Sequence, residues 1–132
     1  MRIILVVLMI TSAFSAIAFD GGAQFKKVCA ACHTIGGGDK LGPDLAGVSE
    51  RRKLDWIVKF VNYPEGMKEG DEDEKGYEKA DKLAIAIDKA YKANMSEQEM
   101  TKTQVQAVLK YIDGLKKSPK GKIVAFEKNR KK

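Results

Sequence analysis

The residues best suited to chemistry stand together at Cys29-Ala30-Ala31-Cys32-His33, and the chain has two cysteines and one histidine in all. Two cysteines three positions apart fall on one face of a helix. From there each sulfur can form a thioether with one vinyl group of a porphyrin. The adjoining His33 is then turned towards the iron as the proximal nitrogen ligand. This C-x-x-C-H pattern predicts one covalently bound haem c, attached through Cys29 and Cys32.

Three other kinds of site could use the same residues. A structural zinc site needs four ligands, usually Cys and His, and the chain has too few of both. A redox dithiol of the thioredoxin type accompanies a βαβ pattern, which the sequence does not show. A plain disulfide suits an exported protein, but it leaves His33 without a role. We therefore favour haem, and the disulfide remains the main alternative.

The N-terminal segment predicts export. Arg2 is followed by an apolar run over residues 3–10 and by small residues that end in Ala16-Ile17-Ala18. A positive start, a short apolar core and an A-x-A end are the features of a secretory signal peptide. We predict that residues 1–18 are a signal peptide cleaved after Ala18, which places the protein in the periplasm. An N-terminal membrane anchor is the alternative, although the stretch lies at the low edge of the length that spans a bilayer.

The formal net charge of +6 is carried by the C-terminus. Residues 116–132 contain eight Lys or Arg and one acidic residue, a net of +7, whereas residues 19–115 contain 15 basic and 17 acidic residues. A run of like charges is by default solvated and disordered. We therefore predict a disordered basic tail over residues 118–132. Because a basic tail on an exported chain does not form a surface that recognises nucleic acid, we expect no nucleic-acid binding.

Apolar residues repeat at helical spacing in four stretches, and no stretch indicates a strand. Ser49 is the expected N-cap of the helix over residues 49–62. Thr101 and Gln104 are expected to form a capping box at the start of the helix over residues 102–118. Residues 64–75 contain a run of acidic side chains and are predicted to form a loop. Four short helices give a thin core, which a large apolar cofactor would complete. The expected helices cover residues 20–32, 49–62, 76–92 and 102–118.

These features resemble the class I monohaem cytochromes c, the small soluble electron carriers of bacteria and mitochondria. The likeness covers about residues 19–117, the predicted cytochrome c domain, and includes Gly42-Pro43-Asp44-Leu45-Ala46-Gly47, which matches the family's G-P-x-L-x-G segment. It also includes Ala93-Asn94-Met95 before the last helix. The resemblance implies an all-α cytochrome c fold, with about four short helices around one haem. The first and last helices would cross at Gly21 or Gly22, Phe25 and Tyr111.

The resemblance also implies roles for residues that support the haem. By similarity, the carbonyl of Pro43 accepts a hydrogen bond from the second ring nitrogen of His33, which fixes the ring's tautomer and orientation. In the family an arginine close after the G-P-x-L-x-G segment often donates to the haem propionates, and Arg51 or Arg52 matches it. From their donor groups alone, Arg51 and Trp56 could both donate hydrogen bonds to the propionates. The alternative is that Trp56 is an ordinary core residue and that the arginines are solvated.

The sixth iron ligand is a methionine if the resemblance holds, because His33 is the single histidine. The candidates are Met67, Met95 and Met100. Met95 lies in the short link before the last helix, where the family places its ligand, and we predict that His33 and Met95 bind the iron. The family usually has proline after this methionine, whereas Ser96 follows it here. Met100 is therefore the next candidate.

A His–Met pair raises the reduction potential and fills both axial positions, which favours electron transfer over catalysis. We predict a single-electron carrier, not an enzyme, that is monomeric and shuttles electrons between redox proteins outside the cytoplasm. Its basic tail would steer it to an acidic partner or an anionic membrane surface. The alternatives are a dedicated cytochrome subunit of a larger oxidoreductase complex and, from another class, a haem enzyme or ligand sensor with an open distal site.

Overall fold

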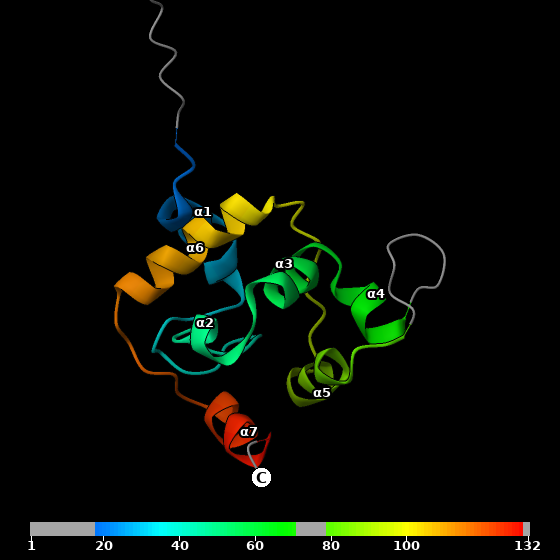
Figure 1. Cartoon of the computed structure of the whole chain (residues 1–132). Helices are drawn as coiled ribbons and strands as arrows, with labels where there is room; N and C mark the ends of the chain where they lie inside the picture. Colours follow the sequence, from blue (N-terminus) through cyan, green and yellow to red (C-terminus); the bar gives the residue numbers. More distant parts are fainter. Residues whose placement is uncertain (1–17, 71–78, 131–132) are drawn as a thin grey trace, which may run out of the picture.

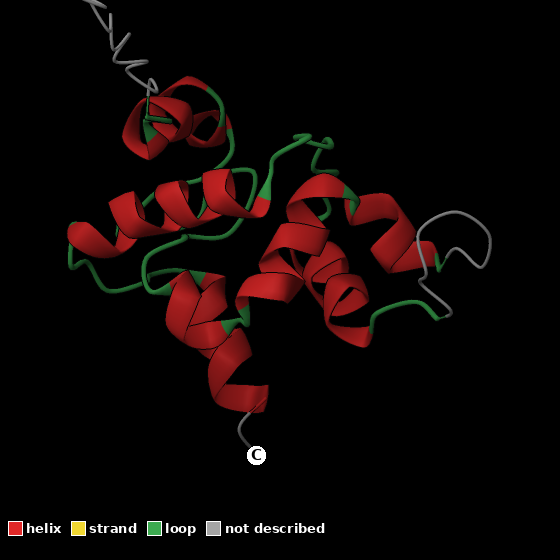
Figure 2. Cartoon of the chain, turned by 45° about the horizontal axis from the view of Figure 1, so that its top comes forward, coloured by secondary structure: helices red, strands yellow, loops and turns green. Residues whose placement is uncertain are grey.

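The structure, a computed structural model, describes residues 18–70 and 79–130, which form seven α-helices and one 3-10 turn without any strand (Figures 1 and 2). The predicted all-α fold is thus confirmed. No helix in these residues has the length and apolar character needed to cross a membrane. The predicted signal peptide lies outside the described residues except for Ala18. The helices are α1 (Gly21–Lys27), α2 (Val48–Arg51), α3 (Leu54–Asn62), α4 (Pro64–Glu69), α5 (Lys82–Tyr91), α6 (Lys102–Gly114) and α7 (Lys122–Arg130).

Helices α1 and α6 cross with their backbones in close approach, as the sequence predicts. The carboxylate of Asp20 starts α1 by accepting hydrogen bonds from two backbone amides of its first turn. At the crossing, a Cβ atom on Gly21 would lie 2.1 Å from the backbone oxygen of Ala107, so only glycine fits there. The rings of Phe25 and Tyr111 pack alongside, with their centroids 5.9 Å apart.

Helix α6 supplies most of the hydrophobic core. It begins at the predicted capping box, in which the Thr101 hydroxyl accepts from the Gln104 amide and the Gln104 side chain accepts from the Thr101 amide. Its apolar face packs on α1 and α3. Helix α6 therefore joins the first helix to a helix in the middle of the chain. The core cluster consists of Phe25, Ile57, Met100, Val105, Val108, Leu109 and Ile112.

Two of the predicted helices are interrupted. The first ends at Lys27, and the cysteines follow in the 3-10 turn Cys29–Ala31, where the amides of Cys32 and His33 both donate to the carbonyl of Cys29. The second was expected to run from Ser49 to Asn62, but Arg52 and Lys53 adopt extended backbone and divide it into α2 and α3. Ser49 lies inside α2 and is not an N-cap.

The prediction of a loop after Tyr63 was wrong for its first part, because residues 64–69 form helix α4. Pro64 occupies the first turn, where its missing amide hydrogen costs no hydrogen bond, and Met67 is buried in this helix. Residues 71–78, which hold most of the acidic run, lie outside the described residues. The next helix, expected over 76–92, is α5, and the carboxylate of Asp81 caps its first turn.

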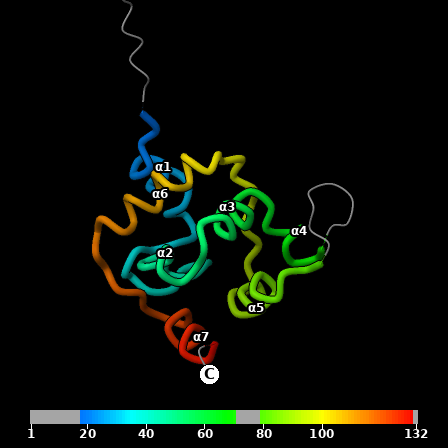
Figure 3. The backbone as a smooth tube through the Cα atoms, viewed as in Figure 1, coloured from blue at the N-terminus to red at the C-terminus, as the bar shows by residue number. Residues whose placement is uncertain are grey.

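The prediction of a disordered tail was wrong for residues 122–130, which form helix α7. After α6 the chain runs along one side of the molecule and returns to lie near α2 (Figure 3). Ile123 of α7 is only 2% exposed, whereas its neighbour Val124 is 48% exposed. The tail therefore places one apolar side chain against the body of the protein.

Candidate cofactor site

A cavity of about 360 Å³ opens between the cysteine turn, α3, α6 and the segment that follows α5. This volume lies within the range of small-molecule and cofactor sites. Most of its wall is apolar, as such sites require. The apolar wall includes Val28, Leu41, Leu45, Val48, Ile57, Phe60, Val61, Ile87, Val105, Val108, Leu109 and Ile112.

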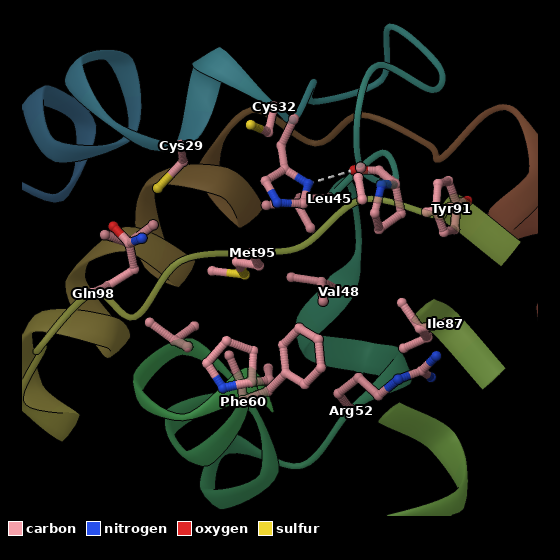
Figure 4. A pocket seen from close by; sticks show the side chains of 18 of the residues that line it. Cys29, Cys32, Leu45, Val48, Arg52, Phe60, Ile87, Tyr91, Met95 and Gln98 are labelled. Carbon is pink, nitrogen blue, oxygen red and sulfur yellow. Dashed lines mark hydrogen bonds between the residues drawn. The ribbon is translucent and has the colours of Figure 1, made fainter. Parts of the chain in front are cut away.

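Cys29 and Cys32 line this cavity as half-buried free thiols. Figure 4 shows both cysteines on one side of the cavity, with Phe60 and Arg52 on the opposite side. Burial raises the pKa of the Cys29 thiol by more than a local backbone hydrogen bond lowers it. The Cys29 side chain is therefore a protonated thiol near neutral pH.

The imidazole of His33 reaches the cavity with its two nitrogens in different surroundings. Its Nδ1 donates a hydrogen bond to the carbonyl oxygen of Pro43 over 2.8 Å, since a carbonyl can only accept (dashed line in Figure 4). Burial lowers the pKa of His33 more than this bond raises it, so the ring is neutral at pH 7. A neutral ring with a proton on Nδ1 keeps a lone pair on Nε2, which is the form that binds a metal.

Gly42 makes room for this histidine ring. A Cβ atom at Gly42 would lie 2.6 Å from Cε1 of His33, inside van der Waals contact. The Gly42 amide donates to the carbonyl of Cys32 over 2.8 Å, and the Leu45 amide donates to the carbonyl of Thr34 over 2.9 Å. The Gly-Pro segment is thus tied to the Cys-His segment on both sides of the ring.

Asp44 holds this loop together, although sequence reasoning did not select it. Its side chain is fully buried and accepts four backbone hydrogen bonds, from the amides of Gly36, Gly38, Ala46 and Lys120, at 2.7 to 3.1 Å. Burial alone would raise the pKa of Asp44, but these four donors outweigh it and lower the pKa. The one sequence signal is an acidic residue placed between apolar neighbours in a glycine-rich loop.

Arg51 and Trp56 both line the cavity, but their donor groups differ in availability. The terminal nitrogens of Arg51 donate to the carbonyls of Ala46 and Asp44. Its Nε is buried and has no hydrogen-bond partner among the described residues. The single donor of Trp56 already binds the Asp81 carboxylate at 3.1 Å. Arg51 Nε therefore has an unused hydrogen-bond donor, although the Glu127 carboxylate lies 4.0 Å away, whereas Trp56 would have to exchange its partner to bind a cofactor carboxylate.

The three candidate methionines occupy different places. Met95 is half-buried and lines the cavity from the segment between α5 and α6 (Figure 4). Met100 also touches the cavity, but it is 9% exposed and belongs to the core cluster. Met67 is 3% exposed and does not line the cavity. The cavity therefore brings His33 and Met95 into one site and leaves Met67 outside it.

The residues of the cavity fit a covalently attached haem c. Two thiols, a neutral imidazole with a free Nε2 and a thioether sulfur meet in one apolar space. The imidazole and the thioether sulfur are ligands that such an iron takes, and the two thiols are suited to covalent attachment of the porphyrin. The buried Nε of Arg51, which makes no hydrogen bond among the described residues, is suited to a carboxylate of the same group. No cluster of three or more Cys, His, Asp or Glu in the described residues could hold a bare metal ion instead.

Comparisons with known proteins agree with this geometry. The family model described as Cytochrome c matches residues 18–116. Among solved structures, a cytochrome c from Rhodothermus marinus is 23% identical, with a TM-score of 0.58 over 72% of each chain. An engineered cytochrome c from the same organism, bound to a carbene intermediate, is also 23% identical over 72% of each chain, with a TM-score of 0.54. These likenesses show the fold, and a search of curated proteins finds no match.

Proposed function

Because the chain belongs to the cytochrome c family, we propose that it is a single-electron carrier with one covalent haem c whose axial ligands are His33 and Met95. The observation that carries this proposal is the arrangement of His33. Its Nδ1 is bound to Pro43 at 2.8 Å, and its ring shares an apolar cavity with two free thiols and with Met95.

Each residue has a distinct part in this function. The thiols of Cys29 and Cys32 would add across two vinyl groups, each S–H hydrogen moving to the neighbouring carbon, so no oxidant is consumed. His33 would bind through Nε2 while Pro43 keeps the proton on Nδ1, and Met95 would supply the opposite ligand. Haem c supplies an iron that alternates between the ferrous and ferric states. The apolar wall excludes water, which keeps the surroundings nearly unchanged when one electron arrives or leaves.

We also propose that the protein is not an enzyme. With His33 and Met95 as ligands, both axial positions belong to the protein and no substrate can bind the iron. The engineered cytochrome c from Rhodothermus marinus, which has a similar fold, is bound to a carbene intermediate. In the present chain the Met95 sulfur would have to leave before such chemistry could start.

The place of action that we propose is the periplasm, reached through the signal peptide over residues 1–18. The partners would be a donor and an acceptor redox protein, and the carrier itself would be a monomer. The net charge of +7 over residues 116–132 favours an acidic or membrane-associated partner, because complementary charge raises association rates. A dedicated subunit of a larger complex would instead co-purify with a stable partner.

The test of the main function is made on the full chain, produced in a host that attaches haem c. We expect the haem to stay with the protein through acid–acetone extraction and to give one reversible one-electron couple. We also expect the weak absorption at the near-infrared edge that marks methionine bound to ferric haem. Extraction of all haem into the solvent would refute the proposal.

The proposed steering is tested separately with exposed lysines. Changing Lys116, Lys117 and Lys128 to Gln should slow electron transfer to an acidic redox protein at low salt and flatten its salt dependence. The matched control changes the exposed lysines Lys53, Lys89 and Lys110 to Gln, which removes the same charge elsewhere. Equal rates for the two triple variants would show that the C-terminal charge has no special role.

A further inference from the structure

Helix α7 lies beyond the residues that match the cytochrome c family, yet it contributes to the cavity wall. The match ends at residue 116, and α7 covers Lys122–Arg130. Its residue Ile123 is 2% exposed and lines the same cavity as His33 and Met95. Its neighbour Val124 points into solvent, at 48% exposure. One side chain of this helix is therefore committed to the cavity.

The turn before α7 is built onto the loop that carries Pro43. The amide of Lys120 donates to Asp44 over 3.1 Å, and the amide of Lys122 donates to Asp39 over 2.8 Å. Gly121 between them has a φ of 80°, and a Cβ there would lie 2.5 Å from the carboxyl carbon of Asp39. Two carboxylates of one loop thus hold the start of α7 in a single position.

Asp39 also connects this turn to α5. The hydroxyl of Tyr91, at the end of α5, donates to the Asp39 carboxylate over 3.1 Å. Burial, together with that carboxylate, raises the pKa of Tyr91, so its hydroxyl keeps its proton and remains a donor. Lys122 reaches back to the same helix end, with its ammonium group 3.2 Å from the carbonyl of Ala90 and 5.0 Å from the centre of the Tyr91 ring.

An ion pair fixes the far end of α7. The carboxylate of Glu127 pairs with Arg52, and it lies 4.0 Å from Nε of Arg51. The side chains of Arg52 and Glu127 are only 5% and 16% exposed, so this pair is shielded from water and salt. Both arginines line the cavity. Loss of Glu127 would leave a buried positive charge without its partner, which is costly.

We propose that helix α7 is a wall of the cofactor cavity that excludes water from the haem, with Ile123 facing the cavity and Glu127 keeping the helix in place. The proposal rests on the proposed function for the identity of the cofactor. Its consequence is electrochemical, because an apolar environment disfavours the ferric state, which carries one more positive charge. Opening this wall would therefore lower the reduction potential.

The deciding experiment compares two neighbouring residues of α7 in the purified holoprotein. Ile123→Ala should lower the reduction potential. It should also speed amide hydrogen exchange over residues 122–130 by about 30-fold or more, since removal of a buried isoleucine loosens the helix. Val124→Ala makes the same kind of truncation on the exposed side and should change neither quantity. Equal potentials and equal exchange in the two variants would overturn the proposal.

A second pair of variants tests the part of Glu127. Glu127→Gln should speed exchange over residues 122–130, whereas Glu50→Gln, at an exposed position, should not. Unchanged exchange in Glu127→Gln would refute the role given to the ion pair. Hydrogen exchange measures the opening of α7 and does not depend on electron transfer. Acid–acetone extraction of the wild-type protein tests the cofactor separately. A failure of the wall is thus distinguishable from a failure of the proposed function.

Discussion

On the attachment side of the cavity, residues 29–47 are tied to one another by backbone hydrogen bonds and by the buried carboxylate of Asp44. On the opposite side, residues 93–97, which include Met95, make no backbone–backbone hydrogen bond within the described part of the chain. This segment is held at its ends, where the Gln98 amide donates to Val61 over 3.1 Å and the Asn62 side chain pairs with the backbone of Met100.

The difference indicates how the two sides of the cavity divide their tasks. Two covalent bonds and one oriented histidine require a loop with a single conformation, which buried hydrogen bonds provide. A methionine ligand needs a less rigid backbone, because its side chain is flexible and one bond to the iron can complete its positioning. We therefore expect changes on the attachment side to affect the whole protein and changes on the Met95 side to affect the iron first.

The largest effect should follow from loss of the thiols. Cys29→Ser or Cys32→Ser leaves one thioether at most and should weaken covalent attachment, and the double variant should abolish it. Acid–acetone extraction followed by haem staining of the denatured protein measures the covalent product. Ala30→Ser is the control, because it adds a hydroxyl between the cysteines without removing a sulfur. Retention of covalent haem in the double variant would contradict the assignment of both attachment sites.

The next effect concerns the iron alone. Met95→Ala should remove the weak near-infrared-edge absorption of the ferric protein and lower the reduction potential, because a sulfur ligand favours the ferrous state. Met100→Ala and Met67→Ala remove buried side chains and should lower the free energy of unfolding while the absorption remains. If Met100→Ala alone removed the absorption, Met100 would be the ligand, and Ser96 in place of the family's proline would mark the change.

Asp44→Asn should destabilise the attachment side without removing any ligand. An amide accepts through one oxygen, so two of the four backbone amides lose their acceptor, at a cost of about 3 kcal/mol. Because folding lowers the pKa of Asp44, its contribution to stability is complete above the unfolded value of about 4 and is lost as the pH falls through the folded value. Denaturant unfolding of the holoprotein at pH 7 and at pH 3 measures both effects.

The control for this variant is the exposed Asp113→Asn, whose unfolding should match the wild type at both pH values. At pH 3 the difference between Asp44→Asn and the wild type should be smaller than at pH 7. A difference that stays constant between the two pH values would show that the charge of Asp44 contributes nothing.

The smallest effect is expected from Lys68, which ties α4 to the Met95 segment. Its ammonium group donates to Asp88 over 3.0 Å and to Asn94 over 3.1 Å. Since Asp88 is partly exposed, Lys68→Met should cost less than about 1 kcal/mol of global stability. The Met95 absorption should nevertheless disappear at a lower denaturant concentration than the helical signal does. Lys102→Met breaks an exposed pair with Asp55 and should leave the two transitions coincident.

Local patterns in the sequence account well for the attachment side and for α6. The C-x-x-C-H spacing and the Thr101–Gln104 capping box depend on residues only a few positions apart. The capping box forms as predicted. The C-x-x-C-H spacing brings both thiols to the cavity, although the cysteines follow the first helix in a 3-10 turn and do not lie within that helix. The pairing of Gly21 with α6 required the family resemblance in addition, because no local rule selects a partner so distant in sequence.

The missed features depend on partners far apart in the chain. Apolar spacing over α3 gives no sign of the break at Arg52, whose side chain pairs with Glu127. The charge of the tail predicts disorder, yet Ile123 and Glu127 dock it through contacts that composition does not encode. The donors of Asp44 come from the same loop and from Lys120, so its role could not be recognised from spacing.

The close approach of Gly21 to Ala107 joins two segments that lie far apart in the sequence. Helix α1 lies near the start of the domain, and its partner α6 lies near the end. Contacts between such distant segments form late, since a long loop must close first. We therefore expect the thiols of the cysteine turn beside α1 to stay accessible for attachment of the cofactor until α1 and α6 pack together.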